Sequence, residues 1–278
     1  NHDATGSQLG GTAFAPSISA GGRFVGFEAS GPPRLVVVDR DADEDGVFDE
    51  YGQPGAVVVE ELFPGSDITI SDDGAVIGYT SSADLGFGKT TPFSEVYWER
   101  RGVERRRMPT IDGGEPDGDS GEPRPSADGR FLAFSSVATN LTADVPPGAG
   151  RGTYVFDAWT GVVERLDSAV PGLFADVPWL ESGAPRISGD GRWVVFEALQ
   201  GLLGGQTSPA FLFDRTTAAV WFADIASSAV ATTRRPAISD DGRHVAFASF
   251  QGLVVQSGTT DLDGNGELRA LQAIDDHD

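Results

Sequence analysis

One segment that occurs five times constrains the fold of this chain more than any other feature. Each copy holds a serine, a glycine three residues later, and then a run of alternating apolar residues. The copies align without gaps and lie roughly fifty to sixty residues apart, which indicates one supersecondary unit copied several times. They read "PSISAGGRFVGFEA" (16–29), "ITISDDGAVIGYTS" (68–81), "PRPSADGRFLAFSS" (123–136), "PRISGDGRWVVFEA" (185–198) and "PAISDDGRHVAFAS" (236–249).

The centre of each copy predicts a tight turn between two strands. Asp-Gly precedes four of the five apolar runs, and glycine supplies the positive φ that such a turn requires. The serine can hydrogen-bond nearby backbone in the turn. Along the second strand, large apolar residues share one face and small residues the other, so that a neighbouring sheet can approach closely. The small positions are Gly26, Gly78, Ala133 and Ala246, with Val195 as the exception.

Two further apolar runs follow each copy and complete a four-stranded unit. The third strands are expected at 34–39, 94–99, 153–158, 210–215 and 252–257, and the fourth at 56–62, 103–108, 162–167, 219–224 and 268–273. A lone four-stranded unit cannot bury both faces, whereas units stacked around an axis can. The sequence therefore predicts an all-β fold, a β-propeller with five four-stranded blades. Six or more blades is the alternative, since residues 1–12 resemble an inter-blade loop.

The repeat also sets the expected domain organisation. A single propeller domain is expected over 13–274, with blades at about 13–62, 66–108, 122–167, 184–224 and 235–274. Residues 1–12 are expected to form an N-terminal tail or inter-blade segment, and 275–278 an acidic tail.

The motif Ser-x-Asp-Gly-Arg followed by two apolar residues, Ala and Phe resembles the TolB-type repeat, which is WD-like and PD40-like. "SSVATNL" (135–141), after the third copy, strengthens the resemblance. The resemblance covers about residues 13 to 274 and implies a propeller of bacterial periplasmic or surface proteins. The second copy departs from it by lacking the Pro and the Arg. The motif specifies a fold rather than an activity, because such propellers serve as scaffolds, receptors and enzyme domains.

The segment "DRDADEDGVFDE", Asp39 to Glu50, predicts a calcium site. It fits the cation loop Asp-x-Asp-x-Asp-Gly-x-x-Asp, in which alternate residues point oxygen atoms inward and Gly46 permits the bend. Gly52 stands where a helix–loop–helix hand has its Glu, so the segment resembles the shorter calcium loops inserted in propeller hairpins. Glu50 is a further candidate ligand. The expected ligands at loop positions one, three, five, seven (its carbonyl) and nine are Asp41, Asp43, Asp45, Val47 and Asp49.

A second loop of this kind, "DLDGNGELR", occurs between the expected third and fourth strands of the fifth blade. Its expected ligands are Asp261, Asp263, Asn265 and the carbonyl of Glu267. Arg269 stands at position nine, so this site has fewer carboxylates and is expected to bind calcium more weakly or to be empty. Both loops have the same place in their blades, which strengthens the assignment. Without metal the crowded carboxylates repel one another, so calcium is expected to stabilise the fold.

The charge of the chain restricts its partners. A formal net charge of −22 repels phosphate backbones, which argues against nucleic acid and suits divalent cations or basic partners. The chain has no Cys, which excludes disulfides and thiol catalysis. No apolar run reaches the ~18–20 residues of a membrane span. The N-terminus lacks a signal segment, so either the signal was removed or this chain is a piece of a longer one.

The residues for catalysis are sparse, and no enzymatic activity is expected. "GDSG" (118–121) imitates the surroundings of a protease serine, but a triad needs a histidine. His2 and His277 lie in the tails, and His244 occupies a slot that Phe24 and Trp193 fill elsewhere, so it is expected to pack. The first strands, which should line the channel, offer Asp67 but otherwise Arg124 and Arg186, a poor set for paired carboxylate catalysis.

Aromatic residues in the loops are the candidate contacts for a ligand, with a folded-back loop core as the alternative. They are Phe87, Phe93, Phe174 and Trp179. The sequence thus predicts an extracytoplasmic, calcium-stabilised β-propeller, periplasmic, extracellular or on the cell surface. It is expected to act as a non-catalytic binding or scaffold module for a protein or glycan. The alternatives are a polysaccharide-type hydrolase and a structural surface protein that self-assembles into an array or fibre.

Overall fold

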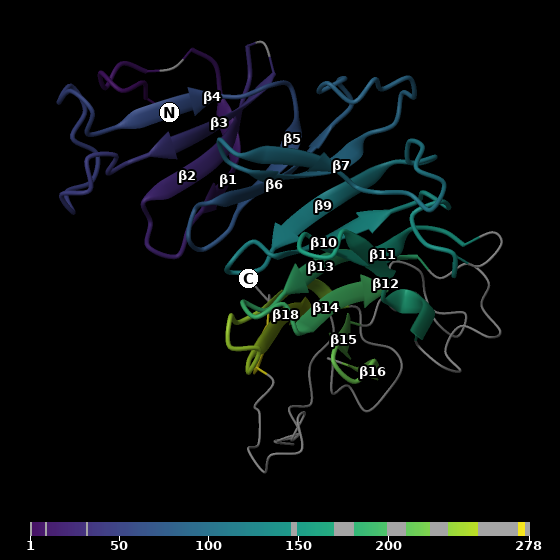
Figure 1. Cartoon of the computed structure of the whole chain (residues 1–278). Coiled ribbons are helices and arrows are strands. Elements are labelled where there is room, and N and C mark those ends of the chain that lie inside the picture. Colours follow the sequence, from purple (N-terminus) through teal and green to yellow (C-terminus); the bar gives the residue numbers. More distant parts are fainter. Residues whose placement is uncertain are drawn as a thin grey trace.

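The structure, a computed structural model, describes residues 2–8, 10–31, 33–145, 149–169, 181–198, 210–222, 233–249 and 272–275. These residues form five β-sheets that follow one another in chain order and stack side by side in an arc (Figure 1). The one helix among them is a single 3₁₀ turn, η1 (Asp167–Ala169). Within these ranges, no helix has the length and apolar character needed to cross a bilayer. The predicted all-β fold is confirmed.

Each of the first four sheets is an antiparallel meander of four strands, one blade of the predicted propeller. The first blade holds β1 (Ala13–Ile18), β2 (Phe24–Ala29), β3 (Arg34–Asp39) and β4 (Val58–Glu61). The second holds β5 (Ser66–Ile70), β6 (Val76–Ser81), β7 (Glu95–Arg100) and β8 (Glu104–Arg107). The third holds β9 (Ser120–Pro125), β10 (Phe131–Ser136), β11 (Gly152–Asp157) and β12 (Val162–Arg165). The fourth holds β13 (Ser182–Ile187), β14 (Trp193–Ala198), β15 (Ala210–Asp214) and β16 (Ala219–Phe222).

The fifth sheet differs from the predicted meander. It contains β17 (Thr233–Ile238), β18 (Val245–Ser249) and β19 (Gln272–Asp275), and β19 pairs in parallel with β18. A parallel pair requires a long crossover, which the connection from β18 to β19 can provide. The predicted third strand of this blade, 252–257, lies outside the described residues, and Asp275 of the predicted acidic tail belongs to β19.

The turn between the first two strands of each blade has the predicted chemistry. In the third blade the Gly129 N–H bonds the Ser126 carbonyl at 2.9 Å, and Gly129 has a φ of 67°. The Ser126 hydroxyl accepts a bond from Phe131 N and donates one to Asp128. Ser126 N also donates to the Phe131 carbonyl at 2.8 Å, so a four-residue loop with a left-handed glycine as its third residue joins the two strands. The equivalent turn glycines, all with positive φ, are Gly22, Gly74, Gly191 and Gly242.

The small residues of one blade receive the large residues of the next, as the alternation predicts. A Cβ placed on Gly26 would lie 3.0–3.3 Å from the side chains of Ile68 and Ile70 in the second blade. One placed on Gly78 would lie 2.7 Å from Leu132 of the third blade. The sheets therefore approach closely, and four apolar clusters join consecutive blades along the arc.

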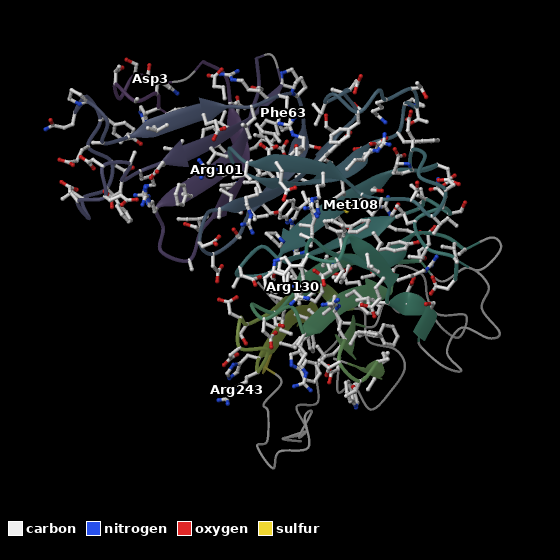
Figure 2. All side chains as sticks on the ribbon, in the orientation of Figure 1. Asp3, Phe63, Arg101, Met108, Arg130 and Arg243 are labelled. Atoms are coloured by element: carbon white, nitrogen blue, oxygen red, sulfur yellow. The ribbon has the colours of Figure 1, made fainter. Side chains whose placement is uncertain are left out.

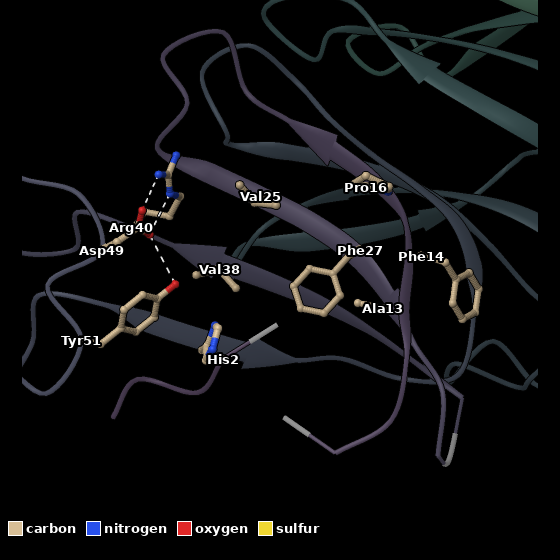
Figure 3. A pocket seen from close by; sticks show the side chains of 10 residues that line it. All are labelled: His2, Ala13, Phe14, Pro16, Val25, Phe27, Val38, Arg40, Asp49 and Tyr51. Atoms are coloured by element: carbon tan, nitrogen blue, oxygen red, sulfur yellow. Dashed lines mark hydrogen bonds and ion pairs between the residues drawn. The ribbon is translucent and has the colours of Figure 1, made fainter. Parts of the chain in front are cut away.

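Among the described residues, no sheet packs on one apolar face of the first blade. Its cluster on this face is built from first-blade residues alone, and Ile18 is 58% exposed where the equivalent Ile70 is 7% exposed. A hollow of about 410 Å³ lies on the same face (Figure 3).

The prediction that His244 packs in the core is wrong. Equivalent residues in the other blades, such as Phe24 and Phe131, lie beneath the turn glycine of the next blade. The side chain of His244 is 66% exposed, because in the described part of the chain no further blade follows it.

Candidate functional site

The loop between β3 and β4 brings the carboxylates of Asp41, Asp43 and Asp45 together. Oxygen atoms of the three side chains lie within 4.8 Å of one another. Gly46 has a φ of 87°, in the left-handed region that favours glycine, and its N–H lies 3.2 and 3.3 Å from the two Asp41 oxygens. The loop is thus folded so that three carboxylates converge, an arrangement suited to a hard divalent cation.

Glu50 is a fourth carboxylate, close enough to this group to be affected by its charge. Desolvation and then the negative charges of Asp45, Asp43 and Asp41 raise the pKa of Glu50 above its ordinary value. A bound cation would relieve that repulsion and favour the ionised form. Glu50, which the sequence offered only as an additional ligand, is not among the three carboxylates that converge, and it stays a predicted additional ligand.

Asp49, the predicted ligand at position nine, is paired instead with Arg40. Arg40 Nε donates to Asp49 Oδ1 at 2.9 Å, and the Tyr51 hydroxyl lies 3.4 Å from the same oxygen (Figure 3). The hydrogen bond from Arg40 lowers the pKa of Asp49 although burial opposes it. The structure thus groups the first three predicted carboxylates and leaves out the fourth, because a neighbouring arginine competes for it. The Val47 side chain is exposed, and its carbonyl remains a predicted ligand.

Arg101 and Arg215 directly follow the third strand of their blades, as Arg40 does, and their contacts explain the pairing of Arg40. Each donates through Nη1 to the carbonyl of the turn glycine of its own blade, at 3.1 Å and 2.7 Å. Each also lies over an aromatic ring of the preceding blade, at 4.7 Å and 4.3 Å from its centroid, and pairs with an outer-strand glutamate of that blade. The rings are those of Phe24 and Phe131, and the glutamates are Glu60 and Glu164.

In the first blade the acidic loop supplies both of these partners. Arg40 donates through Nη1 to the Gly22 carbonyl at 2.8 Å, lies 5.0 Å from the centroid of the Phe48 ring and pairs with Asp49. Phe48 and Asp49 therefore take the places that an aromatic residue and a glutamate of a preceding blade take elsewhere. The loop that contains Asp41, Asp43 and Asp45 therefore also covers part of the apolar face of the first blade on which no other described sheet packs.

Of the predicted aromatic contacts, Phe87 lies at a groove. It is 37% exposed and lines an open hollow of about 370 Å³ beside β8 and the Met108–Gly114 segment. Arg107 lies 5.8 Å from its ring centroid. Phe93 is half-buried. The remaining predicted site residues lie outside the described residues: Phe174, Trp179, Asp261, Asp263, Asn265 and Glu267.

A recurring ion pair was missed at the level of sequence. The arginine after the turn glycine pairs with the aspartate that ends the third strand, at 2.8 Å in the first and third blades and 2.7 Å in the fourth. Figure 2 places one of these arginines, Arg130, near the middle of the arc. The signal for it was present, since Gly-Arg and a strand-ending Asp recur together. The pairs are Arg23–Asp39, Arg130–Asp157 and Arg192–Asp214.

Stacked four-stranded antiparallel sheets, joined through repeated turns, define the fold as a β-propeller. Solved structures agree that this propeller is TolB-like. A TolB-type protein from Agrobacterium tumefaciens is 18% identical, with a TM-score of 0.53, over 88% of this chain and 72% of the other. TolB from Acinetobacter baumannii is 19% identical, with a TM-score of 0.50, over 84% of this chain and 47% of its own length. No model of a protein family matches the sequence, and no curated protein is similar to it.

Proposed function

We propose that this chain is a calcium-stabilised, non-catalytic β-propeller that serves as a binding or scaffold module outside the cytoplasm. The observation that carries the calcium assignment is the convergence of Asp41, Asp43 and Asp45 within 4.8 Å. Calcium suits this flexible set of carboxylates better than magnesium, which demands a near-ideal octahedron. The resemblance to TolB-type repeats supports a periplasmic or cell-surface location.

The proposed binding role rests on the groove beside β8 and the Met108–Gly114 segment. Phe87 borders a groove that also contains Arg107 and Met108, and half-exposed aromatic residues at a groove are frequent anchors for a protein or a sugar ring. The second calcium loop, Asp261 to Glu267, is proposed as a weaker site of the same kind.

Calorimetric titration of chelator-treated protein with calcium tests the metal site. Asp43→Asn should lower the stoichiometry by one site, whereas Glu104→Gln, which removes an exposed charge of a surface ion pair, should leave it unchanged. At 100-fold excess over Kd, calcium should add about 2.7 kcal/mol to the free energy of unfolding. Equal melting temperatures in chelator and in excess calcium would contradict the proposal. A glycan array read with and without calcium tests the binding role.

A second candidate function is self-assembly, which the free face of the first blade favours. Phe14 and Ile18 on this blade are 47% and 58% exposed, and a sheet of another copy could cover them. Light scattering across a range of protein concentrations tests this alternative. A constant monomer mass would exclude it.

A further inference from the structure

The first strands of the blades lie nearest the axis of the arc, since β1, β5, β9, β13 and β17 contact one another in that order. Each of them contains a β-bulge whose residue has a φ between 49° and 57°. Left-handed conformations are strained for residues other than glycine, and bulges are frequent beside functional sites. The bulge residues are Ala15, Asp67, Glu122, Ala184 and Arg235.

Two adjacent blades place an arginine two residues after this bulge. Arg124 of β9 pairs in register with Ala133, and Arg186 of β13 pairs with Val195. The equivalent residues of the first, second and fifth blades are Ser17, Thr69 and Ala237. Two neighbouring inner strands thus carry long cations where the other blades carry small side chains.

Both guanidinium groups have most of their donors free. Arg124 Nη1 donates to the Pro123 carbonyl at 2.7 Å, and Arg186 Nη1 donates to the Pro185 carbonyl at 2.8 Å. Among the described residues, neither forms an ion pair within 4.0 Å, whereas arginines such as Arg130 and Arg165 do. Each guanidinium has five N–H donors, so several on each side chain have no acceptor among the described residues.

The two cations also repel each other. Burial and then the charge of Arg186 lower the pKa of Arg124 to about 10, and burial lowers the pKa of Arg186. Two half-buried positive charges without a direct ion-pair partner are unfavourable, and an anion between them would remove the cost.

Three carboxylates, Asp67, Glu122 and Glu197, act on the two arginines through their charge, but among the described residues none of them forms an ion pair with either guanidinium group. Glu122 Oε2 accepts hydrogen bonds from Ser135 Oγ at 2.8 Å and from Ala184 N at 2.9 Å. Glu197 Oε1 accepts one from Arg235 N. Their negative charges nevertheless surround the two arginines and disfavour a multiply charged ligand such as phosphate.

We propose that Arg124 of β9 and Arg186 of β13 together bind a carboxylate group, of a small organic acid or of a peptide C-terminus, at the inner strands of the third and fourth blades. The planar guanidinium fork matches the two oxygens of a carboxylate, and one negative charge fits among the neighbouring acidic residues. The site lies on the inner strands, away from the acidic loop between β3 and β4, so its test is independent of the calcium proposal.

Calorimetric titration at constant ionic strength in chloride tests the site with four probes. These are acetate, inorganic phosphate, N-acetyl-trialanine with a free C-terminus, and the same peptide as its C-terminal amide. Acetate and the free acid should bind and the amide should not; tighter binding of the free acid than of acetate would assign a peptide C-terminus, and equal binding a small acid. Arg124→Gln and Arg186→Gln should each weaken binding by about tenfold or more. Arg100→Gln, a matched loss of an exposed arginine, should change nothing.

Circular dichroism confirms that each variant is folded, and Arg186→Lys separates charge from shape, since it should bind more weakly than the wild type while keeping the charge. Asp43→Asn should bind the carboxylate probes as the wild type does, whatever its calcium stoichiometry. Absence of binding by the wild type, equal binding of amide and free acid, or tighter binding of inorganic phosphate than of acetate would overturn the proposal.

Discussion

At the scale of single residues, the turn serine stabilises the hairpin between the first two strands through hydrogen bonds of its hydroxyl group. Ser126 is buried, and its hydroxyl both accepts from Phe131 N at 3.0 Å and donates to Asp128 at 2.7 Å. Ser126→Ala leaves a buried N–H and a carboxylate oxygen without this partner. We expect it to lower the free energy of unfolding by about 1–2 kcal/mol, measured by urea denaturation.

The first repeat offers the control for this prediction. Gly21 stands there in place of the aspartate, so Ser19 keeps only the bond from Phe24 N, at 3.1 Å. Ser19→Ala should therefore be less destabilising than Ser126→Ala. Equal losses in the two variants would contradict the role given to the aspartate.

Asp214 should make the stability of the protein depend on acid. Burial alone would raise the pKa of Asp214, but hydrogen bonds from Arg192 and Thr216 hold it well below the usual range. Because this pKa is lower in the folded state, the ionised group stabilises the fold fully above about pH 4, the unfolded value. The contribution is lost as the pH falls through the folded pKa.

We expect Asp214→Asn to destabilise the protein by about 1–3 kcal/mol at neutral pH and to flatten the loss of stability below about pH 4. Denaturation curves measured over a series of pH values report both effects. Glu104→Gln, whose carboxylate lies in an exposed ion pair with Arg106, should leave the pH profile unchanged. A profile for Asp214→Asn as steep as that of the wild type would refute the assignment.

At the scale of elements, the contact between turn glycine and preceding blade fixes how closely the sheets stack. A Cβ on Gly191 would lie 2.0 Å from the Phe131 ring, and Gly191 has a φ of 71°. Gly191→Ala should therefore combine steric overlap with backbone strain and lower the free energy of unfolding by about 3 kcal/mol or more. Thermal and urea unfolding measure the loss.

Gly102, in the turn between β7 and β8, separates these two causes. Its φ of 69° is nearly the same, but nothing lies within 4 Å of the position of its Cβ. Gly102→Ala should cost only the strain, about 1 kcal/mol. If both substitutions cost the same, the stacking contact contributes nothing.

The features that sequence predicted at this scale are those set by local chemistry. The Ser-x-Asp-Gly turns and the period-two alternation depend on neighbouring residues, and the structure shows both. The pairing of Asp49 could not be predicted from the local pattern. Asp49 pairs with Arg40 because, in the described part of the chain, no preceding blade offers Arg40 a glutamate. Glu122 was overlooked for two reasons. The first strand of the third blade begins at Ser120, earlier than the repeat suggested. The bulge residue has a left-handed conformation without being glycine, so the sequence does not indicate the bulge.

At the scale of the whole molecule, one end of the arc has an apolar surface on which no other described strand packs. The position of Ile18 and Ile70 is the same in consecutive blades, yet their exposed fractions are 58% and 7%. This difference could not be predicted from the repeat, since identical patterns give identical expectations. It depends only on whether another blade lies beside the strand.

The two isoleucines therefore form a matched pair for testing whether the free face is free in solution. Ile70→Asn removes a side chain packed on Gly26 and buries an amide there, so we expect a loss of about 2–4 kcal/mol in urea denaturation. Ile18→Asn should change stability by less than about 0.5 kcal/mol, since its side chain already contacts water. A loss at Ile18 as large as that at Ile70 would mean that a second β-surface covers the first blade. Light scattering on both variants would then show whether that surface belongs to another copy, because Ile18→Asn alone would lower the mass.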